Sequence, residues 1–109
     1  MYLFITLIHN VGELAGPQQV FFICPSSGGD GIVIQRWDMH RTDGSDPQMD
    51  IAGEGSMKYT TSAERLEVQN LEPTDEGLYV CTLTVDSGPS VQALGGCLII
   101  YGEYFIVMI

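Results

Sequence analysis

The sequence has little positive charge. Only four Lys and Arg residues stand against fourteen Asp and Glu residues, which gives the 109-residue chain a formal net charge of −10. A surface this acidic repels the phosphates of nucleic acids and the anionic headgroups of membranes. Neither is therefore expected as a partner, and the charge serves either solubility or attraction to a basic protein.

Patterns typical of helices, metal sites and enzymes are also missing. No long stretch places apolar residues at i, i+3, i+4 and i+7. The three cysteines (24, 81 and 97) and two histidines (9 and 40) form no short-spaced pair of the zinc-binding kind. The turn with Asp43 and Asp46 has too few carboxylates for a calcium loop. GxSxG, HExxH and phosphate-loop motifs are absent, so no metal, cofactor, catalytic residue or enzyme activity is expected.

Long hydrophobic runs are absent too. The first ten residues hold no basic segment and no clear small-residue cleavage site, so no secretory signal is expected there. The final YFIVMI is far too short to cross a bilayer, so this segment is not expected to insert into a membrane. The composition, 45% apolar and 17% charged, is that of a globular protein, and we predict one domain over 1–109.

The apolar residues form short β-type segments between turn residues. Val, Ile, Phe and Tyr alternate with polar residues, and clusters of Gly, Pro, Asp and Ser interrupt them. Eight or nine such segments predict an all-β sandwich or barrel. The main expected strands are 1–8, 20–24, 32–40, 48–52, 57–61, 65–71, 78–85 and 91–101.

Two cysteines, the single tryptophan and a tyrosine motif stand at informative separations. Cys24 and Cys81 lie on alternating segments 57 positions apart, and Trp37 follows Cys24 by thirteen residues. The stretch DEGLYVC places Asp75 and Tyr79 six and two residues before Cys81. In a sandwich, two inward cysteines can be bridged, an indole can pack on the bridge, and such a tyrosine can bond the preceding corner.

This combination resembles the immunoglobulin superfamily over nearly the whole chain. The resemblance implies an immunoglobulin-like two-sheet Greek-key sandwich with a Cys24–Cys81 disulfide, two free thiols being the alternative. The cysteine separation and the extra QMDIAGEGS segment are similar to V-type (V-set) domains, which add strands C′ and C″. Lys58 either pairs with Asp75, as the family pattern implies, or is a solvated surface lysine. The implied core residues are Trp37, Tyr79, Leu66 and Asp75.

The stretch LGGC (94–97) falls where V-type domains carry the joining-segment motif F/W-G-x-G-T. The aromatic residue is missing and the glycines are adjacent, so LGGC is similar to a degraded joining motif in a joined V–J-like domain. Whether the family's glycine bulge forms is left open. With the other two cysteines paired, Cys97 is either a buried thiol in a strand or an inter-chain link on an edge strand.

The resemblance implies an extracellular or cell-surface module for recognition, adhesion or immune-receptor-type binding, whose partner is another protein or a second copy. The alternative is a structural or homodimerising domain of a larger receptor. The expected loops, 25–31, 51–56 and 86–90, lack a Tyr or Trp anchor, so plain connecting loops remain an alternative. The candidate loop residues are Ser26, Ser27, Asp30, Gly53, Glu54, Asp86, Ser87 and Ser90.

The resemblance also implies a C–C′–F–G dimer face. If Trp37 points inward, alternate residues of its strand point outward beside those of the F strand. The candidate dimer-face residues are Ile34, Arg36, Asp38, His40, Val80 and Thr82. A dimer surface and a solvated face both fit this mixture. Gln35 shares the inward parity of Trp37, so either its amide is hydrogen-bonded or the alternation slips there. The apolar ends are expected to be covered, by each other or by a second copy.

Overall fold

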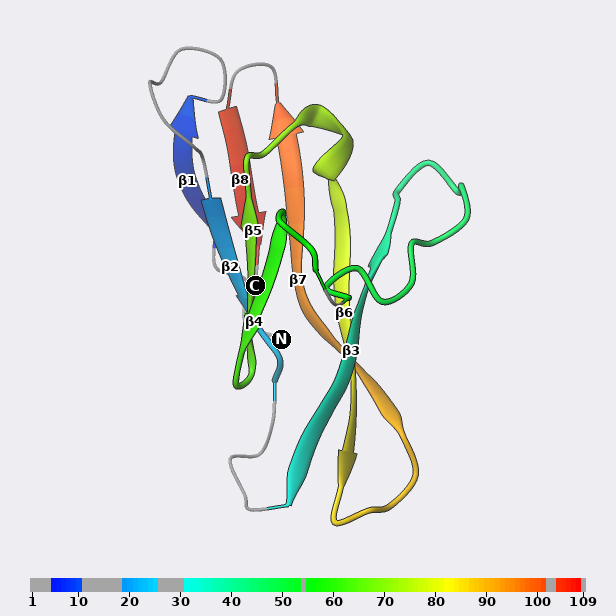
Figure 1. Cartoon of the computed structure of the whole chain (residues 1–109). Helices are drawn as coiled ribbons and strands as arrows, with labels where there is room; N and C mark the ends of the chain where they lie inside the picture. The colour runs from blue at the N-terminus through cyan, green and yellow to red at the C-terminus, as the bar shows by residue number, and fades with distance from the viewer. Residues whose placement is uncertain (1–4, 11–18, 26–30, 54, 102–103, 109) are drawn as a thin grey trace.

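Two antiparallel sheets form a sandwich in the computed structural model, which describes residues 5–10, 19–25, 31–53, 55–101 and 104–108 (Figure 1). The larger sheet has the strand order β1–β8–β7–β6–β3 and the smaller sheet the order β2–β5–β4. The fold is the predicted all-β, immunoglobulin-like sandwich. Its strands are β1 (Ile5–Asn10), β2 (Gln19–Ile23), β3 (Ile32–His40), β4 (Tyr59–Ser62), β5 (Arg65–Gln69), β6 (Gly77–Val85), β7 (Val91–Tyr101) and β8 (Tyr104–Met108).

The core lies between the two sheets, where the inward side chains of alternating strands meet. Val20 and Phe22 of β2 and Leu66 and Val68 of β5 are all buried. The predicted Cys24–Cys81 disulfide is confirmed, and it joins the end of β2 to the middle of β6 with a Cα–Cα distance of 5.8 Å. The remaining buried residues include Trp37, Met39, Tyr79, Leu83 and Leu98.

The aromatic residues pack around this disulfide. Trp37 is the register partner of Cys81 on the neighbouring strand, so its ring lies on the same inner side. The rings of Phe22 and Tyr79 stack with centroids 4.4 Å apart and thereby connect the two sheets. Aromatic contacts of this kind add to the stabilisation from burial alone.

A network of polar contacts fixes the corner that leads into β6. A short 3₁₀ helix, η1 (Pro73–Asp75), turns the chain there, and Tyr79 donates its hydroxyl to the Asp75 carbonyl at 2.5 Å. The buried Asp75 carboxylate pairs with Lys58 Nζ at 2.9 Å. Lys58 also donates to the carbonyls of Gln69 and Asn70. The structure thus selects the ion pair over a solvated lysine. Burial, with the nearby Asp75 charge, raises the pKa of Tyr79, which stays a donor.

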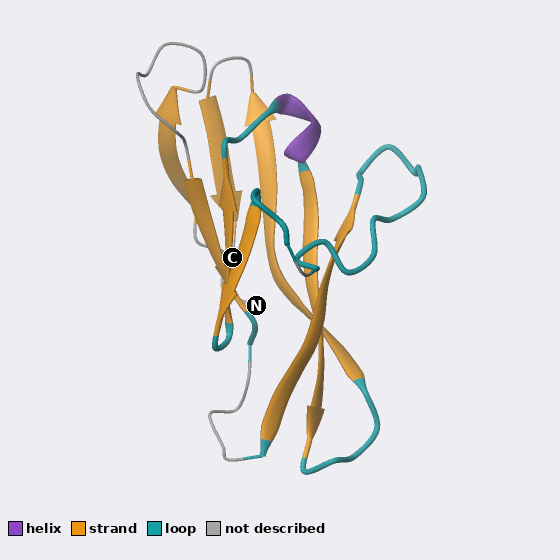
Figure 2. Cartoon of the chain, viewed as in Figure 1, coloured by secondary structure: helices purple, strands orange, loops and turns teal. Residues whose placement is uncertain are grey.

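The segment between β3 and β4 departs from the V-type expectation. Figure 2 shows a long loop there. Gln48 forms an isolated bridge with Met39, with two backbone hydrogen bonds of 2.8 Å, but the described part of 41–58 contains neither a C′ nor a C″ strand. Pro47 cannot donate to a sheet ladder, and Gly44, Asp50 and Gly55 adopt positive φ angles, which interrupts extended pairing.

The apolar end segments pair with each other, which is the first of the two arrangements expected for them. β1 runs antiparallel to β8, and β8 runs antiparallel to β7. β7 therefore lies inside the sheet and is not its edge. Of the described helices, none has the length and apolar character needed to span a membrane.

Two adjacent glycines let β7 pass close to the core aromatics. Tyr79 pairs with Gly96 and Val80 pairs with Leu94, so Gly95 is the extra residue of a β-bulge. A Cβ on Gly95 would lie 2.5 Å from Trp37 Cζ3, and a Cβ on Gly96 would lie 2.6 Å from Phe22 Cδ1. A glycine bulge therefore does form in LGGC, and both glycines are required by close approach of the rings.

Substituting either glycine should destabilise the fold. Gly95→Ala and Gly96→Ala are each expected to lower the free energy of unfolding by about 1–3 kcal/mol, because the Trp37 and Phe22 rings are held in the packed core. Guanidinium unfolding measures this. Gly53→Ala is the matched control: its new Cβ meets nothing closer than the Asp50 carbonyl at 3.5 Å, so its effect should stay within about 0.5 kcal/mol. Three equally stable variants would contradict this packing.

Candidate recognition surface

The larger sheet turns one surface away from the core, and we call the part formed by β3, β6 and β7 the outer face. Residues on this side follow from the strand register, since successive side chains of a strand point to opposite sides. β3 pairs with β6 and β6 pairs with β7, so these two registers identify the residues that share the outward side. The outer face consists of Val33, Arg36, Asp38, His40, Leu78, Val80, Thr82, Thr84, Gln92, Leu94 and Cys97.

Ile34 does not belong to the outer face, so the prediction that it points outward is wrong. Ile34 pairs with Leu83 and Arg36 pairs with Thr82, which leaves Gln35 as the extra residue of a bulge. One extra residue reverses the direction of the side chains beyond the bulge. Ile34 therefore packs against the core, while Gln35 is exposed. The alternation therefore slips at Gln35, whose Oε1 accepts a hydrogen bond from Ser90 Oγ at 2.9 Å.

Apolar side chains occupy the centre of the outer face. Leu94, in the centre, is 52% exposed, and Val33, which pairs with Thr84 near the start of β3, is 56% exposed. Val80 pairs with Leu94 and is half-buried, as is Leu78 next to it on the same side of β6. Thr82 is buried among these neighbours, and its hydroxyl has no hydrogen-bond partner within the described parts of the chain. Gln92, the register partner of Thr82, is the exposed polar residue next to this apolar centre.

Charged residues of β3 border this centre, but only one of them is accessible. Arg36 Nε donates to Asp38 Oδ2 at 3.1 Å, and the Arg36 side chain is 39% exposed while that of Asp38 is fully buried. The backbone N–H of Asp50 donates to Asp38 Oδ1 at 2.8 Å. Asp38 was expected to be an outward surface residue. It is instead covered by the segment after β3, which it holds in place, and His40 beside it is half-buried.

The described parts of the candidate loops do not gather at one place. Asp86 N donates to the Gly31 carbonyl at 2.9 Å, which joins the β6–β7 loop to the start of β3 at one end of the sandwich (Figure 1). Residues 51–53 lie beside the middle of β3, since Ile51 N donates to the Trp37 carbonyl at 2.9 Å. Ser87 and Asp86 form a tight turn with positive φ angles. The candidate residues Ser26, Ser27, Asp30 and Glu54 lie outside the described residues.

Cys97 lies on the outer face between Leu78 and Met108 of the neighbouring strands. It is unpaired and half-buried, while the next residue, Leu98, is fully buried on the core side. Neither predicted setting fits, because the thiol points away from the core and β7 is not an edge strand. Burial, and secondarily the charge of Glu76, raises the pKa of Cys97.

Sequence reasoning missed Leu94 and Val33, the two most exposed apolar residues of the outer face. The bulge at Gly95 separates Leu94 from the alternation of the rest of β7, and the bulge at Gln35 does the same for Val33. The adjacent glycines at 95 and 96 were the available signal for the first bulge. For the second bulge the only signal in the sequence was that regular alternation would point the polar Gln35 inward.

No cluster of three or more His, Cys, Asp or Glu side chains able to hold a metal ion occurs among the described residues. Protein-family models give no match to the chain, and searches of curated proteins and of solved structures give no significant match. The class of the fold therefore rests on the molecule itself: two packed antiparallel sheets, a disulfide between them and a tyrosine corner define an immunoglobulin-like domain.

The environment of Cys97 predicts that its thiol reacts slowly with alkylating agents. At neutral pH, iodoacetamide should alkylate Cys97 of the folded protein more slowly than that of the protein unfolded in guanidinium without reductant, because a raised pKa lowers the thiolate fraction. Glu76→Gln should increase the folded rate modestly, since it removes the charge but keeps an acceptor for the Ile100 N–H, now 2.8 Å from Glu76 Oε1. Equal rates before and after unfolding would contradict this environment.

Proposed function

We propose that the chain is an extracellular protein-recognition domain of the immunoglobulin V type, which binds its partner through the outer face. The carrying observation is the apolar centre with exposed Leu94, together with exposed Val33 and the accessible Arg36 nearer the start of β3. A sheet surface that faces only water is usually polar, whereas a surface that contacts a protein combines apolar residues with Arg.

The outward surface of the smaller sheet supports this choice by contrast. Its exposed Phe21 is covered by the guanidinium of Arg65, 4.7 Å from the ring centroid. Gln69 Nε2 donates to Glu67 Oε1 at 2.8 Å next to it. Charged and amide groups thus satisfy one another there, and Arg65 covers part of the Phe21 ring, while Ile23 on the same side is 51% exposed.

The V-type assignment rests on the Lys58–Asp75 ion pair and the Tyr79 corner, which match the family pattern, and not on the strands C′ and C″, which the described residues lack. β3, β6 and β7 are neighbours in one sheet, as strands C, F and G are in immunoglobulin-like domains generally. The disulfide supports an oxidising compartment, and hence an extracellular or cell-surface location.

The net charge constrains the partner. Two copies would bring together formal charges of −10 each, so electrostatics opposes a homodimer at low salt. A neutral or basic partner protein meets no such repulsion. Salt dependence separates the two cases: added salt strengthens association between two copies, whereas it weakens binding to a basic partner.

The outer face can be tested with one substitution and a matched control. Binding of the purified domain to a panel of cell-surface ectodomains, and to itself, should reveal a partner whose affinity falls about 10- to 100-fold with Leu94→Arg, the loss typical of a central interface residue. Thr60→Arg, at an exposed position of β4 in the other sheet, should leave the affinity unchanged. A partner that binds the Leu94 variant as tightly as the original chain would overturn the proposal.

A further inference from the structure

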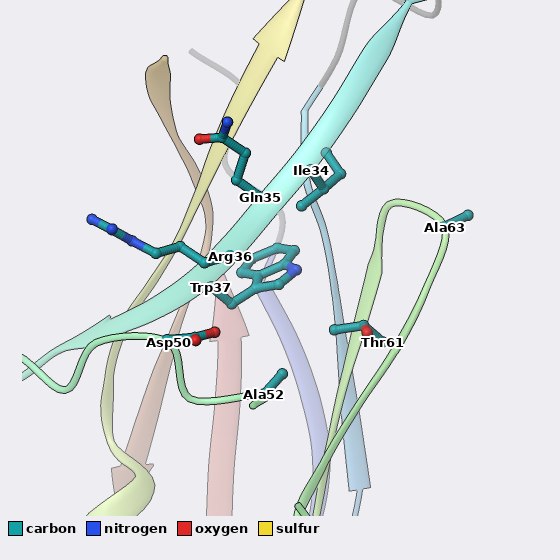
Figure 3. Close-up of a pocket in the computed structure, with 8 residues that line it drawn as sticks. All are labelled: Ile34, Gln35, Arg36, Trp37, Asp50, Ala52, Thr61 and Ala63. Atoms are coloured by element: carbon teal, nitrogen blue, oxygen red, sulfur yellow. The ribbon is translucent and has the colours of Figure 1, made fainter. Parts of the chain in front are cut away.

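A cleft opens between β3 and β4, on the opposite side of β3 from the outer face. Its volume is about 110 Å³, and Figure 3 shows its lining. Eight residues line it: Ile34, Gln35, Arg36, Trp37, Asp50, Ala52, Thr61 and Ala63. Figure 3 shows the Gln35 and Arg36 side chains directed away from Thr61 and Ala63. We call it the Trp37 cleft.

The Trp37 cleft exists because no described strand packs over the inward side of the small sheet at Thr61. Thr61 pairs with Leu66, and the Leu66 side chain is fully buried in the core. Thr61 therefore also occupies an inward position, yet its side chain is exposed. The described residues between β3 and β4 form no strand that could close this side.

A buried hydrogen-bond donor faces the Trp37 cleft. Trp37 is only 1% exposed, and its Nε1 has no acceptor within the described residues. In Figure 3 this nitrogen is on the ring edge nearest to Thr61. A buried N–H without an acceptor is unfavourable, so an acceptor in the cleft would stabilise it. Because Nε1 itself is almost closed to solvent, the acceptor reaches it when the neighbouring side chains shift slightly.

The size and charge of the cleft narrow the choice of occupant. Its volume far exceeds the roughly 10–15 Å³ that one water molecule needs. Ile34, Ala52 and Ala63 provide apolar walls that favour an aliphatic body. Asp38 neutralises the Arg36 charge, and Asp50 lies among the residues that line the cleft of a chain whose net charge is −10, so an anionic acceptor is repelled.

We propose that the Trp37 cleft binds a small neutral amide. The carbonyl oxygen of the amide accepts a hydrogen bond from Trp37 Nε1. The aliphatic part of the amide lies against Ile34 and Ala52, and its NH₂ group lies near the Thr61 hydroxyl. The amide belongs either to a free small molecule or to an Asn or Gln side chain of a partner protein. This site shares Arg36 with the outer face but lies on the other side of β3, and either proposal can fail without the other.

The single tryptophan makes the site directly observable, because the chain has one indole N–H signal in a proton–nitrogen NMR spectrum. Isobutyramide should shift that signal saturably, with the roughly millimolar affinity of so small a ligand. Isobutyrate, with the same body and a negative charge, should bind more weakly. Isobutylammonium, which lacks an acceptor, should leave the signal unchanged. No saturable shift with isobutyramide, or an equal shift with isobutylammonium, would overturn the proposal.

Two variants test whether the shift of the indole signal arises from binding in the Trp37 cleft. Thr61→Phe suits a strand and fills the cleft, so it should abolish the shift, whereas Thr60→Phe, the same change at the neighbouring outward position, should preserve it. A shift that persists in the folded Thr61 variant would place the binding elsewhere. N-acetylglutaminamide identifies the source of the amide: binding as tight as that of isobutyramide indicates a protein side chain, and binding of isobutyramide alone indicates a free small molecule.

Discussion

The disulfide between Cys24 and Cys81 is the constraint from which the rest of the structure follows. It joins the small sheet to strand β6 of the large sheet and holds the two Cα atoms 5.8 Å apart. Trp37 lies beside Cys81 in the register, and Phe22 stacks on Tyr79 across the same gap. A chain of 109 residues buries a modest core, so a covalent link between its layers contributes a large part of the stability.

The packing around the disulfide also shapes the outer face. Because the Trp37 and Phe22 rings fill the space beside β7, that strand can pass only with glycine at 95 and 96. The extra residue at Gly95 then turns Leu94 to the opposite side of the sheet, into the apolar centre next to Val80. The same close packing in the core therefore positions the exposed residue that we assign to partner recognition.

Away from the disulfide the two sheets are less well closed. The segment after β3 is attached through the Met39–Gln48 bridge and the contact from Asp50 to the buried Asp38, but it adds no full strand. This arrangement seals the Asp38 side of β3 and leaves the Trp37 cleft open on the other. The edge of the sandwich is thus the place where this chain differs most from the V-type pattern that its cysteines and Tyr79 predict.

The contrast between sequence and structure has a physical basis. The disulfide, the burial of Trp37 and the Lys58–Asp75 pair depend on residue types at fixed separations, which a sequence displays. The bulges at Gln35 and Gly95 decide which side of the sheet Ile34 and Leu94 face, because one extra residue reverses the direction of every side chain beyond it in the strand. The pairing of β1 with β8 and the loop that replaces C′ and C″ depend on contacts between distant segments, which alternation alone does not specify.

The role of the disulfide can be measured directly. Guanidinium unfolding of a Cys24→Ala/Cys81→Ala double variant should be compared with that of the parent chain, both carrying Cys97→Ser to prevent thiol exchange. For a sequence separation of 57 residues, the loss of the crosslink should lower the free energy of unfolding by about 4 kcal/mol. A loss below about 1 kcal/mol would show that the two sheets hold together without the bond, and it would contradict the central role of the disulfide in this fold.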